Sequence, residues 1–130
     1  MPQQPIELIL TRHWASYLAV PVWVMSEAGD LLYYNEAAEA VVGRRYDEAG
    51  EMPGEELAKI FKTTAADGSP ISAEALPLNI ALTQRRPAHL ALRIQGLDGV
   101  LRDIEATAFP LEGQGGRHLG AVVFFWEVHE

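Results

Sequence analysis

The run from Leu119 to Val128 constrains the fold of this chain more than any other. It reads Leu-Gly-Ala-Val-Val-Phe-Phe-Trp-Glu-Val, with no polar residue before Glu127. A strand with one face in water alternates apolar and polar side chains, whereas a strand without alternation is covered on both faces. Residues 119–128 are therefore expected to form a strand in the middle of a sheet.

A strand, a turn, a second strand and a helix are expected between Val20 and Gly43. Two short runs rich in β-branched and aromatic residues, 22–25 and 31–34, flank the turn sequence Ala-Gly-Asp and predict a hairpin. Asn35 occupies the N-cap position of the helix that follows. Gly43 is expected to end that helix.

Two further strands are predicted in the last third of the chain. Apolar and polar side chains alternate over residues 90–95 and 103–108, and Asp98-Gly99 supplies a tight turn between them. These two strands are expected to expose one face to solvent. Asp103 and Glu105, about 7 Å apart on one side of a strand, are expected on that face rather than in an acid/base site.

The N-terminal segment, residues 5–18, is predicted to be an amphipathic helix with Pro5 at its first position. Its apolar stripe needs a surface to cover. A short helix is expected over residues 55–62 and a polar loop over 63–70. A main helix should begin at Pro77 and stop at Arg85-Arg86-Pro87.

Composition limits the possible functions. The 130 residues carry a net charge of −8 and include no cysteine. The negative charge makes nucleic acid and a membrane surface poor direct partners. Disulfides and thiolate chemistry are excluded. No run approaches the roughly eighteen apolar residues of a membrane helix, and Met1-Pro2-Gln3-Gln4 lacks the basic start of a signal peptide, so a cytoplasmic location is expected.

The order of these segments resembles that of a PAS domain, the cytosolic sensor module. The similarity rests on Gly29-Asp30-Leu31-Leu32-Tyr33-Tyr34-Asn35 with the helix after it, on Asp67-Gly68-Ser69-Pro70-Ile71, on Asp98-Gly99 with Arg102-Asp103-Ile104, and on Phe109-Pro110-Leu111. It implies an α+β fold with a five-stranded antiparallel sheet in the order 2-1-5-4-3 and short helices on one face. Residues 1–19 would be an N-terminal helix, and residues 20–130 a single PAS-like domain.

The resemblance also implies a ligand cavity inside the sheet. Packing alone would account for many of these residues, although two alanines on one inner strand leave room for a pocket. The cavity candidates are Tyr33, Tyr34, Phe61, Leu78, Leu82, Leu92, Ile94, Ala106, Ala108 and Phe124. A homodimer interface is expected on the outer face, because one short helix can cover only part of the apolar side of the central strands. The alternative is a monomer in which the N-terminal helix folds back on its own sheet. The interface candidates are Ile6, Ile9, Leu10, His13, Trp14, Tyr17, Val123 and Phe125.

Neither a metal site nor a bound cofactor is expected. The four histidines, at 13, 89, 118 and 129, lack metal-ligand spacing. Haem-binding PAS domains carry a ligand histidine on the main helix, and residues 77–86 contain none. The covalent flavin chemistry of light-sensing relatives needs a cysteine, so it is excluded.

The sequence therefore favours a sensory or regulatory PAS domain in signal transduction, without catalysis. It would form a homodimer, act on a downstream effector domain or protein, and bind a small apolar ligand. Glu127-Val128-His129 departs from the Asp-[Ile/Val]-Thr ending that couples many PAS domains to an output helix. The alternatives are a small α+β-cone enzyme of the isomerase kind, with an acidic base in an apolar cavity, and a ligand-free dimerisation adaptor.

Overall fold

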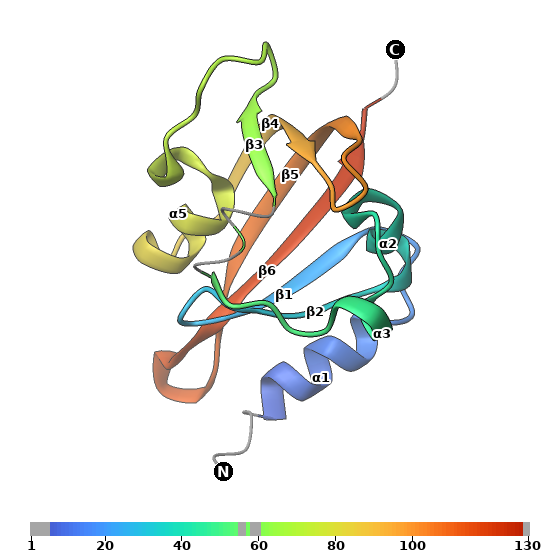
Figure 1. Cartoon of the computed structure of the whole chain (residues 1–130). Helices are drawn as coiled ribbons and strands as arrows, with labels where there is room; N and C mark the ends of the chain where they lie inside the picture. Colours follow the sequence, from blue (N-terminus) through green and yellow to red (C-terminus); the bar gives the residue numbers. More distant parts are fainter. Residues whose placement is uncertain (1–5, 55–56, 58–60, 129–130) are drawn as a thin grey trace.

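The computed structural model describes residues 6–54, 57 and 61–128 and shows an antiparallel sheet flanked by helices on both faces (Figure 1). The sheet has six strands in the order β2-β1-β6-β5-β4-β3. The strands are β1 (Val22–Ser26), β2 (Leu31–Tyr34), β3 (Lys62–Ala65), β4 (Ala88–Gln95), β5 (Leu101–Glu112) and β6 (His118–Glu127). The helices are α1 (Ile6–Ala15), α2 (Glu36–Val42), α3 (Tyr46–Ala49) and α5 (Pro77–Gln84), with 3-10 turns at Ala73–Ala75 and Gln114–Gly116.

The predicted α+β fold and its strand order are confirmed, with β1 and β6 both inside the sheet and β6 one of its two middle strands. The sheet has one strand more than expected. The additional strand, β3, pairs with β4 from Lys62 opposite Gln95 to Ala65 opposite Leu92. It lies where the sequence analysis expects the end of a short helix and the start of a polar loop. Most of that helix, residues 55–56 and 58–60, is outside the described residues.

Local signals identified the first hairpin and its helix correctly. The Asn35 side chain accepts a hydrogen bond from the Ala38 N–H and caps α2. Gly43 ends α2 with φ at 87°, a left-handed conformation that glycine adopts without a steric penalty. Pro77 begins α5, as expected. None of the helices in the described part of the chain is long and apolar enough to cross a bilayer.

Strand β6 separates two apolar cores. The inner core lies between the sheet and α2 and α5, and it includes Val123 and Phe125 of β6. The outer core lies between the sheet and α1, and it includes Val122 and Phe124. Successive side chains of a strand point to opposite faces, so an apolar strand between two cores needs no polar alternation.

Helix α1 covers part of the outer face of its own sheet (Figure 1). Leu8, Thr11 and Ala15 are its buried residues. Most of the apolar stripe expected from the sequence points away from the sheet, with Ile6 66% and Tyr17 77% exposed, whereas Trp14 stacks on Phe124. Packing of α1 on the sheet therefore leaves most of the stripe exposed to solvent.

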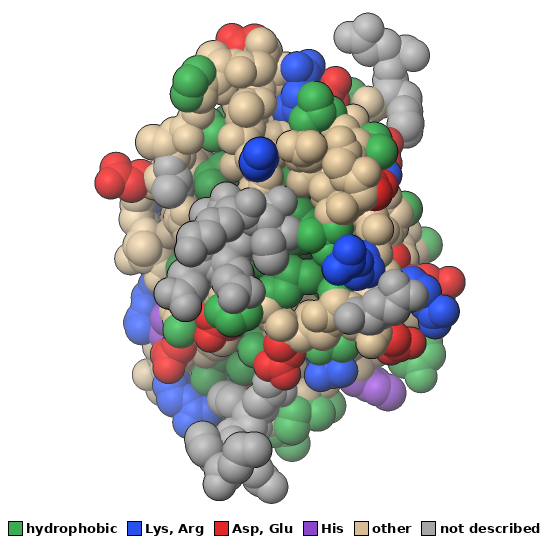
Figure 2. All heavy atoms as spheres, viewed as in Figure 1, with side chains coloured by type: hydrophobic (Ala, Val, Ile, Leu, Met, Phe, Trp, Pro, Cys, Tyr) green, Lys and Arg blue, Asp and Glu red, His purple; other side chains and the backbone are tan. Residues whose placement is uncertain are grey.

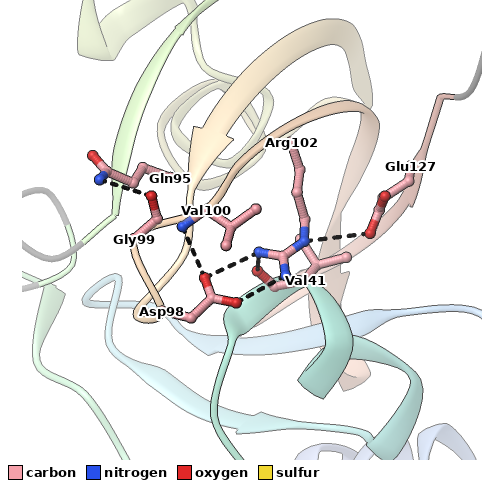
Figure 3. Close-up of polar contacts among 7 residues, drawn as sticks. All are labelled: Val41, Gln95, Asp98, Gly99, Val100, Arg102 and Glu127. Carbon is pink, nitrogen blue, oxygen red and sulfur yellow. Dashed lines mark hydrogen bonds and ion pairs between the residues drawn. The ribbon is translucent and has the colours of Figure 1, made fainter.

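The β4–β5 turn is fastened to the end of α2 by Arg102 (Figure 3). Its guanidinium donates to both carboxylate oxygens of Asp98, over 3.2 and 2.9 Å, and to the Val41 carbonyl oxygen over 3.2 Å. It also forms an ion pair with Glu127 at 3.4 Å. A cation beside the last carbonyl groups of a helix is favourable. Through these contacts Arg102 connects α2, the β4–β5 hairpin and the end of β6.

Candidate functional site

A cavity of about 470 Å³ lies between the inner face of the sheet and the segments that lead into α5. Figure 2 shows hydrophobic side chains in a hollow on this side of the molecule. The volume falls within the range of small-molecule sites. The lining residues are Trp23, Gly29, Gly54, Leu57, Phe61, Lys62, Thr63, Ile71, Leu76, Pro77, Leu78, Asn79, Leu92, Ile94, Ile104, Ala106, Val123 and Phe125.

Half of the ten cavity residues expected from the sequence line this cavity. They are Phe61, Leu78, Leu92, Ile94 and Ala106. The strand residues among them come from β4 and β5, where alternation with polar side chains fixed the inward face. Ala106 is 5% exposed and its small side chain leaves part of the volume open.

The other five candidates lie elsewhere. Tyr34 is fully buried in the inner core, and its hydroxyl donates to the Arg44 carbonyl oxygen over 2.8 Å. Ala108 is fully buried in the same core, and Leu82 packs against it, but neither is among the lining residues. Tyr33 and Phe124 pack against the outer core, so both were assigned to the wrong face.

The assignment of β6 was wrong by one residue. Phe124 stacks against Trp14 of α1 and Phe109 of β5, with ring centroids 6.2 and 5.8 Å away. Val123 and Phe125, expected at an interface on the outer face, line the cavity instead. A one-residue change of phase moves every side chain of a strand to the other face. No polar residue between Leu119 and Trp126 marks which side chains of β6 face inward.

Tyr33 instead belongs to a polar and aromatic contact beside α1. The guanidinium carbon of Arg12 lies 4.8 Å from the Tyr33 ring centroid and 5.3 Å from that of Tyr46. Such contacts favour the cation. Burial raises the pKa of both phenols, and the Arg12 charge partly opposes that rise.

Trp23 is the main lining residue that the sequence analysis missed. Its ring lies 5.3 Å from the Phe61 ring and 5.4 Å from the Phe125 ring, between centroids. It pairs with Val123 across β1 and β6, which places both on the cavity side. In the sequence, Trp23 lies between Val22 and Val24, so its side chain points to the opposite face of the strand from theirs. The sequence did not show which of these two faces lines the cavity.

The cavity is mostly apolar in its described part. Among its described lining residues none is an aspartate, glutamate or histidine. The lining residues with a hydroxyl, amide or amine side chain are Lys62, Thr63 and Asn79. Asp103 and Glu105 lie on the opposite face of β5, as expected, where they meet Arg93 at 2.9 Å and His89 at 3.1 Å. No group of metal-ligating side chains occurs among the residues that the structure describes.

The fold is similar to that of solved PAS and LOV domains. The PAS domain of BvgS from Bordetella pertussis is 17% identical over 95% of this chain and 87% of its own, with a TM-score of 0.62. The PAS domain of nitrogen regulation protein NR(II) from Vibrio parahaemolyticus is 17% identical over 92% of this chain and 98% of its own, with a TM-score of 0.61. The Rhodobacter sphaeroides LOV protein is 11% identical over 97% of this chain and 70% of its own, with a TM-score of 0.72.

No protein-family model and no curated protein matches the sequence. The structural similarity confirms the PAS fold that the order of sequence segments indicated.

Proposed function

We propose that this chain is a sensory or regulatory PAS module that binds a small apolar ligand in the cavity and pairs with a second copy of itself through α1. It would act in the cytoplasm on a downstream effector domain or protein, without catalysing a reaction. The observation that carries this proposal is the position of β6 between the cavity and α1.

The ligand part of the proposal rests on the cavity and its lining. Leu92, Ile94, Ile104 and Phe125 supply an apolar wall that is almost completely buried in the folded chain. A volume near 470 Å³ falls within the range of small-molecule sites. This favours a ligand binder over an adaptor with a filled core. The lack of an aspartate, glutamate or histidine among the described lining residues disfavours the isomerase alternative.

The dimer part rests on the exposed side of α1. Ile9 and Leu10 are 51% and 55% exposed, and they continue the patch formed by Ile6, Trp14 and Tyr17. Single exposed apolar residues are ordinary, but a contiguous patch marks an interaction site. A second copy is the best partner because this patch is apolar, and a twofold axis would place it against itself. The interface proposed here consists of Ile6, Ile9, Leu10, His13, Trp14 and Tyr17.

The central strand would connect the two sites. A ligand against Val123 and Phe125 presses on the inner face of β6, whose outer face holds Phe124 under the Trp14 ring. Adjacent residues of one strand cannot move independently. A ligand in the cavity would therefore change the packing of Phe124 against Trp14 and, with it, the position of α1.

Native mass spectrometry of the purified protein tests both parts at once. We expect a dimer that carries additional mass from a small molecule, which gentle activation removes. A filled-core adaptor would give a dimer with no additional mass and a cavity that binds no apolar dye. A monomer at every concentration would contradict the pairing through α1.

A further inference from the structure

We propose that α2 couples the end of β6 to the end of α1, so that a disturbance at either element reaches the other through this helix. The inference goes beyond the proposed function, because this route requires neither a ligand in the cavity nor pairing of two chains. It rests on the contacts at the two ends of α2 and on the shortness of the helix between them.

The first end of α2 is bound to the end of α1 and to the segment that follows it. Asn35 caps the helix and donates to the carbonyl oxygens of Ala15 and Val20 over 2.9 Å each. Its amide oxygen accepts from the N–H groups of Val22 and Ala38 over 3.1 and 3.0 Å. One fully buried side chain therefore holds both the first turn of α2 and the last residue of α1.

The other end of α2 is bound to the β4–β5 turn and to β6. The last carbonyl groups of a helix have no partners within the helix. Here the Val41 carbonyl oxygen accepts from Arg102 over 3.2 Å, and the Val42 carbonyl oxygen accepts from the Leu97 N–H over 2.7 Å. The Arg102 guanidinium also pairs with Glu127 of β6 at 3.4 Å (Figure 3). The end of β6 is thus connected to α2 through one side chain.

The β4–β5 turn also packs closely against the end of α2. A Cβ atom at Gly96 would lie 2.7 Å from the Val41 carbonyl oxygen, and one at Gly43 would lie 2.8 Å from the Asp98 backbone nitrogen. Glycine at both positions allows the two backbones to touch. A displacement of the turn would therefore displace the last turn of α2.

The length of α2 makes its two ends interdependent. It has seven residues, whereas an isolated helix shorter than about 12–15 residues is marginally stable in water. Ala38, Val41 and Val42 bury its inner side, and the partners described above satisfy its terminal groups. Helix formation is cooperative, so the loss of partners at one end loosens the whole helix and, with it, the contacts of Asn35.

Amide hydrogen exchange measured by NMR tests this coupling. In Arg102→Gln, the N–H groups of Val22 and Ala38, which donate to Asn35, should exchange about tenfold faster relative to the Val123 amide. Tenfold is the effect of losing one charge-assisted hydrogen bond. The Val123 amide is the internal reference for global unfolding, because it lies inside the sheet between β1 and β5.

Two further variants distinguish this contact from general effects of a substitution. Gly96→Ala disturbs the same end of α2 from the turn and should accelerate the same two amides. Arg93→Gln is the matched control, since it also removes an arginine from an ion pair, with Asp103 at 2.9 Å, but on the outer face of the sheet. It should leave the exchange of both amides unchanged. The carbonyl ¹³C signal of Ala15 should shift in Arg102→Gln and Gly96→Ala, because Asn35 donates to that carbonyl.

Faster exchange confined to Leu97 and the last turn of α2 would show that the two ends of the helix are independent, and would overturn the proposal. An equal increase at Val22, Ala38 and Val123 would mean global destabilisation without a coupled unit, and would overturn it as well. The same acceleration in Arg93→Gln would show that the effect does not pass through α2.

Discussion

The side-chain amide of Asn35 donates a hydrogen bond to the Ala15 carbonyl oxygen over 2.9 Å, which joins the start of α2 to the end of α1. The same nitrogen donates to the Val20 carbonyl oxygen, also over 2.9 Å. The amide oxygen accepts from the backbone N–H groups of Val22 and Ala38. Asn35 is fully buried, so one side chain satisfies backbone groups of three neighbouring segments.

We expect Asn35→Asp to destabilise the fold more than Asn35→Ala does. The carboxylate keeps the two accepted hydrogen bonds, but it places a buried negative charge against the carbonyl oxygens of Ala15 and Val20. An uncompensated buried charge costs about 3–5 kcal/mol, whereas alanine loses the cap and leaves backbone groups unpaired. Urea unfolding at neutral pH measures both variants. Equal stability of Asn35→Asp and wild type would show that this contact is unimportant.

A second prediction concerns acid stability and the Arg102–Asp98 pair. Hydrogen bonds from the Arg102 guanidinium and from the Val100 N–H lower the pKa of Asp98 from 3.8 to about 2. Because the pKa is lower in the folded chain, the ionised carboxylate stabilises the fold fully above about pH 4. That contribution decreases as the pH falls toward 2.

Thermal melts across this pH range check the sign. The difference in melting temperature between wild type and Asp98→Asn should be largest near neutral pH and shrink below about pH 4. Arg102→Gln should weaken the dependence, since it removes the main donor to Asp98. A difference that stays constant down to about pH 2 would refute this assignment.

The features that were predictable from the sequence are those with a local cause. Gly29 and Gly99 have φ values of 89° and 79°, as their turn positions require. Asn35 was recognisable as an N-cap, but its bonds to Ala15 and Val20 depend on where α1 ends in space. Strand β3 was missed for a related reason, because its strand state comes from pairing with a distant segment, β4.

In an uninterrupted apolar segment, the sequence does not show which side chains face the inner core and which face the outer core. Strand β4 could be oriented because Arg93 and Gln95 alternate with Leu92 and Ile94. Strand β6 offered two apolar faces, so Phe124 and Phe125 were interchangeable in the sequence. In α1 the residues buried against the sheet are Leu8, Thr11 and Ala15, which lie outside the predicted apolar stripe; of that stripe, Trp14 packs on the sheet.

A third prediction uses the two inner alanines of β5. Ala106→Leu should fill the cavity and abolish binding of an apolar dye while the domain stays folded. Ala108→Leu is the matched control, because Ala108 is fully buried and absent from the lining. Overpacking there should cost about 1–3 kcal/mol. Dye titration and thermal melts measure both variants, and undiminished dye binding by Ala106→Leu would show that the dye site lies elsewhere.

The last prediction separates the two sides of α1. Leu10 is 55% exposed and lies in the proposed dimer interface, whereas Leu8 is 5% exposed and packs on the sheet. Leu10→Glu should change the stability of the monomer by no more than about 0.5 kcal/mol, as surface substitutions usually do. In the dimer the same charge would be buried against apolar side chains, so pairing should be lost. Leu8→Glu should instead unfold or strongly destabilise the chain at any concentration.

Light scattering over about a hundredfold dilution distinguishes these outcomes, because the dimer is favoured by mass action. Wild type should pass from about twice 14.3 kDa toward 14.3 kDa on dilution, and Leu10→Glu should stay at the lower mass with an unchanged melting temperature at low concentration. A wild-type mass of 14.3 kDa at every concentration would exclude the dimer. The same dimer mass for wild type and Leu10→Glu would place the interface away from the exposed side of α1.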